Sequence, residues 1–144
     1  MSENWVDDIN AMHKKFGVHD WFKAELKKDP NKLKEFLEFR MKMVQEEVDE
    51  TNEAIEQKNP EEIVDGLIDM CVFAIGTLDA FGIDAHKAWD EIYNANMMKE
   101  VGVKEGRPNP LGLPDLIKPD NWRFFNQPPA MLEIKNIDNY IPMS

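Results

Sequence analysis

The chain has 144 residues, a net charge of −11 at pH 7 and an apolar fraction of 42%. This length and apolar content suit one compact domain with a hydrophobic core, and they argue against a disordered chain. The acidic balance argues against direct binding of a nucleic acid, because a phosphate backbone needs a basic surface.

The N-terminal half of the sequence predicts helices. The first residues, MSENWVDDIN, lack the basic and apolar segments of a secretory signal. An amphipathic helix is predicted over residues 3–16 and ends at Gly17, because apolar residues recur there at helical spacing, at Trp5, Ile9, Met12 and Phe16. A short helix is predicted over residues 20–28. A long helix follows over about 30–57, since Asp29-Pro30 is typical of a helix start.

The next predicted helix begins at Asn59-Pro60, which combines a capping residue with a proline at the first helical position. This helix, over about 60–80, is apolar on nearly every side from Leu67 to Leu78, which predicts a central position. A further helix is predicted over 85–100. Residues 103–144 are rich in Pro and Gly and are predicted as an extended tail. The predicted fold class is therefore all-α.

Cys71 is the only cysteine of the sequence. A disulfide framework is therefore excluded, and a reducing cytoplasm is the expected compartment. The apolar neighbours of Cys71 predict a buried, inert thiol. The longest apolar run is too short to span a bilayer.

Carboxylates border the apolar faces of both long helices. At about 100° per residue, Glu47 lies about 60° and Glu50 about 120° from the apolar stripe, so both flank the buried face. On the next helix, Glu62, Asp65 and Asp69 fall within about 60° of one another. No Lys or Arg occurs between Ile63 and His86 to neutralise them. Carboxylates on facing helices without matching bases predict a divalent metal, Mg²⁺ or Mn²⁺.

Two alternatives compete with the metal hypothesis. The first is a non-catalytic helical interaction protein with a solvated acidic face, an explanation that suits Asp49, Glu53, Glu56 and Glu61. It suits Asp65 and Asp69 less well, because their neighbours are apolar. The second is a di-iron oxidase, which requires Glu-x-x-His on two helices. The acidic helices contain no such His.

Five segments of the sequence resemble the MazG-like, all-α nucleoside triphosphate pyrophosphohydrolases of phages and bacteria. They are, in chain order, MHKKFGV, QEEVDE, AIGTLDAFGID, AWDEIYNANMMK and LIKPDNW. The resemblance spans most of residues 9–122. It implies an antiparallel four-helix bundle in a domain over 1–102, with the tail over 103–144 packed on the bundle or on a partner subunit. It also implies a homodimer or homotetramer, in the cytoplasm of a bacterium or of an infected host cell.

The family motif implies a set of metal ligands. The motif is Glu-Glu-x-x-Glu followed on the next helix by Glu-x-x-Asp, but Gly66 stands where the second helix should carry its Glu. Asp65 is expected to supply the missing ligand, with Glu62 as the substitute. The number of metals stays open. The implied metal ligands are Glu47, Glu50, Asp65, Asp69 and Glu62.

The resemblance also implies the reaction. The substrate is expected to be a nucleoside triphosphate, preferably a deoxynucleotide, cleaved to the monophosphate and pyrophosphate. A metal-activated water attacks the α-phosphate, and Glu46 or Glu47 accepts its proton. The implied phosphate contacts are Asn96, Lys99, Lys104 and Arg107, of which Asn96 and Lys99 fall on the apolar side of the 85–100 helix.

The base preference is not fixed by the residues, and the alarmone ppGpp also remains a candidate substrate. Phe16, Trp21, Trp122 and His13 are candidates for a base pocket, but each is also typical of a core or surface position. Lys99 has the alternative of a surface lysine, and Lys104 and Arg107 that of solvated loop charges. Arg40 lies on the apolar side of its helix, where it could pair with an acid instead of the substrate.

Overall fold

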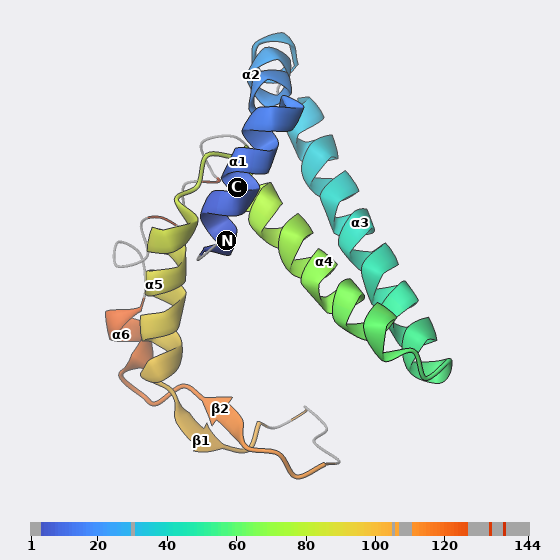
Figure 1. The fold of residues 1–144 in the computed structure, drawn as a ribbon. Helices are drawn as coiled ribbons and strands as arrows, with labels where there is room; N and C mark the ends of the chain where they lie inside the picture. The colour runs from blue at the N-terminus through green and yellow to red at the C-terminus, as the bar shows by residue number, and fades with distance from the viewer. Residues whose placement is uncertain are drawn as a thin grey trace. The chain divides into compact units, whose positions relative to one another are not determined.

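The computed structural model describes residues 4–29, 31–104, 106, 111–126, 133 and 137. The chain divides into two compact units after Ala85. The described part of the first unit contains four helices: α1 (Trp5–Phe16), α2 (Val18–Lys28), α3 (Asn31–Glu56) and α4 (Pro60–Ala80) (Figure 1). The predicted domain limits, 1–102 and 103–144, stay predictions, because a functional domain need not coincide with a compact unit.

The predicted helix ends are confirmed by local geometry. Gly17 separates α1 from α2 and has φ of 76°, a left-handed conformation that glycine adopts without steric cost. The side chain of Asn59 accepts a hydrogen bond from the backbone N–H of Glu62 at 3.3 Å, and Pro60 opens α4. The short connection after α3 makes α3 and α4 antiparallel neighbours (Figure 1).

The core of the first unit lies where α2, the start of α3 and the end of α4 meet. Leu33 and Phe81 are fully buried there, and Phe22 is nearly so. The ring centroids of Phe22 and Phe81 lie 5.0 Å apart, and those of Phe36 and Phe81 lie 5.8 Å apart, in edge-to-face contacts. This aromatic cluster fixes the N-terminal helices against one end of the α3–α4 pair.

The outer face of α4 differs from the prediction of a central helix. α4 packs on α3 and α1, but the side chains of Val64 and Leu67 are 59% and 52% exposed. An all-round apolar helix in a single chain of this size therefore keeps part of its apolar surface in contact with solvent. Among the described residues, no single helix is long and apolar enough to cross a membrane; α4 and α5 (Ala85–Met97) reach that composition only as a bent pair.

The second unit contains two short strands, so the described chain is not purely helical. Strands β1 (Glu100–Gly102) and β2 (Asp115–Ile117) form a two-stranded antiparallel sheet, in which Val101 pairs with Leu116. Both strands are edge strands, which is compatible with the prolines between and around them. A short helix, α6 (Trp122–Phe125), follows. The prediction of a purely extended tail is therefore wrong for this segment.

Candidate functional site

Five carboxylates interact where α3 and α4 run side by side. The pKa of Glu47 is raised above its ordinary value, first by partial burial and then by the negative charges of Glu50, Asp69, Asp65 and Glu46. Charge repulsion in water fades within about 10 Å at physiological salt, so these groups share one region. We call these five residues the acidic cluster. Glu50, Asp65 and Asp69 join Glu47 as the helical spacing predicts. Glu46 takes part as well, whereas Glu62 of the predicted set does not.

Asp69 and Asp65 lie one turn apart on α4, but they differ in exposure. Asp69 is half-buried, and its pKa is raised by this burial, by the charge of Asp65 and by a hydrogen bond between the two carboxyl groups. Asp65 is exposed, so the expectation that its apolar neighbours draw it toward the core is wrong. Those neighbours, such as Val64, are themselves exposed in the single chain.

The acidic cluster has no basic partner within the part of the chain that the structure describes. None of the five residues forms an ion pair with a Lys, an Arg or a His there. The uncompensated charge and the oxygen-only donor set fit a hard divalent cation such as Mg²⁺. In the described structure these ligand atoms are not gathered as closely as a bound ion requires, so the side chains must turn toward the ion.

The close packing of Gly66 against Thr51 explains why the family's glutamate is absent at residue 66. Gly66 is buried where α4 packs closely on α3, and a Cβ atom there would overlap Thr51 Oγ1 and lie 3.3 Å from Thr51 Cβ. Thr51 Oγ1 in turn donates a hydrogen bond to the carbonyl oxygen of Glu47 at 2.6 Å. A glutamate at residue 66 therefore has no room beside Thr51. Glu62, the other substitute ligand, is exposed and does not contribute to the shifted pKa of Glu47.

The four expected phosphate contacts belong to the second unit. Asn96 is exposed, so its predicted inward position is wrong. Lys99 is half-buried, and its Nζ atom lies 5.7 Å from the ring centre of Trp122. Trp122 is a core residue of this unit, since it is buried and its indole N–H donates to the Ala95 carbonyl at 2.6 Å. Lys104 is half-buried, and Arg107 lies outside the described residues.

A second polar cluster connects α1 and α2 to the end of α4. A ring nitrogen of His13 and one of His19 lie 2.7 and 2.6 Å from Asp79 Oδ2, and Asn10 Nδ2 donates to Asp79 Oδ1 at 2.7 Å. Burial alone would raise the pKa of Asp79, but the hydrogen bonds from Asn10, His19 and His13 hold it below its ordinary value. Burial lowers the pKa of His13 and outweighs the opposing effect of Asp79. We call these residues the His–Asp network.

The ligand atoms of the His–Asp network lie within 4.8 Å of one another at His13, His19 and Asp79. Among the described residues, this is the closest grouping of metal-ligating side chains, and its donors are softer than those of the acidic cluster. Short hydrogen bonds already join these groups in pairs, and they account for the arrangement without an ion. The sequence prediction missed Asp79, since only the fold brings it to histidines more than 60 residues away.

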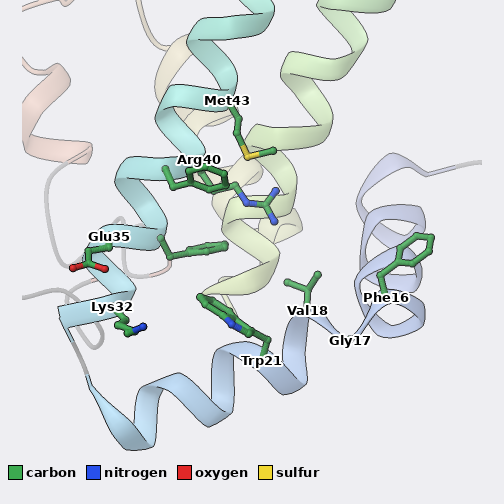
Figure 2. A pocket seen from close by; sticks show the side chains of 10 residues that line it. Phe16, Gly17, Val18, Trp21, Lys32, Glu35, Arg40 and Met43 are labelled. Carbon is green, nitrogen blue, oxygen red and sulfur yellow. The ribbon is translucent and has the colours of Figure 1, made fainter.

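A pocket of about 540 Å³ lies between the α1–α2 junction and the first half of α3 (Figure 2). Aromatic residues dominate its wall, including Phe16, Trp21 and Phe36, and Arg40 and Met43 extend it along α3. In Figure 2 the Arg40 guanidinium points from α3 into the space toward α1, whereas the Glu35 carboxylate points away from it. The predicted base-pocket candidates Phe16 and Trp21 therefore share a pocket, while His13 belongs to the His–Asp network.

Neutralising one member of the acidic cluster is expected to stabilise the metal-free protein. Because the folded-state pKa of Asp69 is raised, its charge opposes folding above that pKa and its protonation favours folding below it. Asp69→Asn should raise the melting temperature by a few degrees at neutral pH in EDTA. The advantage should shrink as the pH falls through the raised pKa toward the ordinary value. A lower melting temperature for the variant at neutral pH would contradict the repulsion.

Comparison with known proteins gives one match. The model of the family described as phosphoribosyl-ATP pyrophosphohydrolase matches residues 17–96. The matched segment covers α2, α3, α4 and nearly all of α5, and it contains the whole acidic cluster. No curated protein and no solved structure matches the chain.

Proposed function

The chain belongs to the phosphoribosyl-ATP pyrophosphohydrolase family, within the MazG-like all-α superfamily, and we propose that it hydrolyses a nucleoside triphosphate, by preference a deoxynucleotide. The products are the nucleoside monophosphate and pyrophosphate, and the reaction requires Mg²⁺ or Mn²⁺. The family supports hydrolysis of a phosphate anhydride. The preference for a deoxynucleotide and the requirement for a metal go beyond what the family supports, and they are our proposal.

The observation that carries the proposal is the acidic cluster without a basic partner. Mutually repelling carboxylates on two packed helices destabilise a fold unless a cation binds between them. Glu47, Glu50 and Asp69 are the proposed metal ligands, and Asp65 takes the place of the glutamate that Gly66 excludes. A bound Mg²⁺ neutralises phosphate charge and makes the attacking water more acidic.

Glu47 is the proposed proton acceptor, with Glu46 as the alternative. Both are carboxylates of the acidic cluster, close to the place proposed for the ion and its water. The hydrogen bond from Thr51 Oγ1 to its backbone carbonyl and the close α3–α4 contact place the backbone of Glu47 beside α4. Asn96, Lys99, Lys104 and Arg107 remain the proposed phosphate contacts.

A homodimer or homotetramer is part of the proposal. Several large apolar side chains of α3 and α4 are at least half exposed in the single chain: Phe39, Met41, Ile55, Val64 and Leu67. Apolar surface of this extent is typical of an interface between subunits. Sedimentation at several protein concentrations measures the assembly. If the protein stayed monomeric at high concentration, the proposed homodimer or homotetramer would be refuted.

A panel of nucleotides tests the proposed reaction. Deoxynucleoside and ribonucleoside triphosphates, phosphoribosyl-ATP and ppGpp are incubated with the protein and Mg²⁺, and monophosphate and pyrophosphate are separated by chromatography. Pyrophosphate release from a deoxynucleotide that stops in EDTA is the expected result. If phosphoribosyl-ATP were the only compound cleaved, the proposal that the substrate is a nucleoside triphosphate, by preference a deoxynucleotide, would be refuted. The absence of any cleavage would favour a non-catalytic interaction protein.

A further inference from the structure

The pocket and the acidic cluster lie along one face of α3. Phe36, Arg40, Met43 and Glu47 are spaced by four, three and four residues, which places them on one stripe of the helix. At 1.5 Å per residue, Arg40 and Glu47 are separated by roughly 10 Å along the axis. This is about the separation between the base edge and the phosphates of an extended nucleotide. A nucleotide with its phosphates at the acidic cluster can therefore extend its base into the pocket.

Arg40 is a half-buried cation with no carboxylate partner in the described structure. Its guanidinium lies 5.0 Å from the ring centre of Phe36, and it takes part in none of the ion pairs of the described residues. Burial lowers its pKa, so the surroundings disfavour its charge. A guanidinium in such a position gains from hydrogen-bond acceptors, and a ligand in the pocket can provide them in place of water.

The walls of the pocket suit a flat aromatic ring. The ring centroids of Trp21 and Phe36 lie 5.5 Å apart on the wall formed by α2 and α3. Phe16 also lines the pocket, from the end of α1. Aromatic side chains bind nucleobases by stacking, with little dependence on the base. Stacking therefore provides affinity in this pocket, and the polar edge of the base must provide the selectivity.

The His–Asp network holds the wall opposite α3 in place. His13 and His19 flank the Gly17 turn, on which Phe16 and Val18 line the pocket, and Asp79 anchors both rings to α4. A Cβ atom at residue 76 would lie 3.2 Å from the His13 ring and 3.5 Å from Arg40 Nη1, so both side chains approach the same point of α4. The network thus fixes the pocket wall without offering Arg40 a carboxylate.

We propose that this pocket receives the base of the nucleotide and that Arg40 selects bases with a carbonyl group at the edge that enters. The inference rests on the proposed function. A guanidinium has donors only, so it pairs with the O6 and N7 atoms of guanine or hypoxanthine and with the O4 atom of uracil or thymine. The amino groups of adenine and cytosine at the same positions are donors, so adenine offers Arg40 only N7 and cytosine offers it no acceptor at C4. The selected substrates are therefore guanine, hypoxanthine, uracil and thymine nucleotides.

Two pairs of substrates test the selectivity. The bases of dITP and dATP differ at C6, and those of dUTP and dCTP differ at C4, in each case by a carbonyl instead of an amino group. We expect kcat/KM to favour the carbonyl member of each pair by roughly tenfold to a hundredfold. Arg40→Met, which keeps an unbranched side chain over Phe36, should bring both ratios close to one. Arg123→Met, on the exposed surface of α6, should leave both ratios unchanged.

The ratio within a pair does not depend on the fraction of folded enzyme, so a loss of stability in Arg40→Met does not affect the result. Turnover with equal kcat/KM within each pair would overturn this inference and leave the proposed function intact. A preference for the carbonyl member that persists in Arg40→Met would do the same. A preference for phosphoribosyl-ATP that is lost in Arg40→Met would instead place a phosphate against Arg40 and would also overturn it. If no nucleotide is cleaved, the proposed function fails and this inference fails with it.

Discussion

Glu50→Gln is expected to lower the rate of pyrophosphate release by roughly 10²- to 10³-fold, since a metal ligand accounts for several kcal/mol of transition-state stabilisation. After burial, the charge of Glu50 has the largest effect on the pKa of Glu47. Glutamine keeps the length and the helix propensity of the side chain and removes only the negative charge. The substitution therefore tests the acidic cluster with little effect on the fold. Steady-state kinetics with saturating Mg²⁺ measure the loss.

The same variant should also lose its thermal response to Mg²⁺. An ion that binds only the folded state raises the melting temperature as its concentration exceeds the dissociation constant. The native protein should show this rise, and Glu50→Gln should show little of it. Glu53→Gln is the matched control, because Glu53 is exposed on α3 and does not contribute to the shifted pKa of Glu47. Equal behaviour of the two variants would exclude Glu50 as a metal ligand.

Local signals predicted the helices well because they act over a few residues. The cap at Asn59, the proline that follows it and the Gly17 turn each have their predicted role. The acidic cluster was predictable for the same reason, since helical spacing alone placed Glu47 beside Glu50 and Asp65 beside Asp69. The family pattern then indicated that the two helices face each other.

Features that depend on distant residues were not predictable from the sequence. Asp79 looked like one more acid at the end of an apolar helix, and only the packing of α1 and α2 on α4 brings the two histidines to it. The strands β1 and β2 are too short for a periodic pattern. The exposure of Val64 on α4 also escaped prediction, because an apolar sequence does not reveal whether its own chain or a second copy covers it.

Gly66→Ala is expected to destabilise the protein by about 1–3 kcal/mol, the usual cost of adding volume to a tightly packed contact. The direction is opposite to helix propensity, which favours alanine over glycine in a helix interior by up to about 1 kcal/mol. The clash decides the sign because the new Cβ atom would overlap Thr51 Oγ1 on the facing helix. Urea unfolding in EDTA gives the difference in free energy without a contribution from bound metal.

Removing the Thr51 hydroxyl should make room for the new methyl group. Thr51→Ala alone should cost about 1 kcal/mol, since it loses the hydrogen bond to the Glu47 carbonyl. In the double variant, the Cβ atoms of residues 51 and 66 meet at a tight but tolerable distance, so Gly66→Ala should then be close to neutral. The coupling energy of the cycle should therefore be favourable and exceed about 0.5 kcal/mol. Purely additive effects would show that the helices do not meet at Gly66, and the explanation for the missing motif glutamate would fail with them.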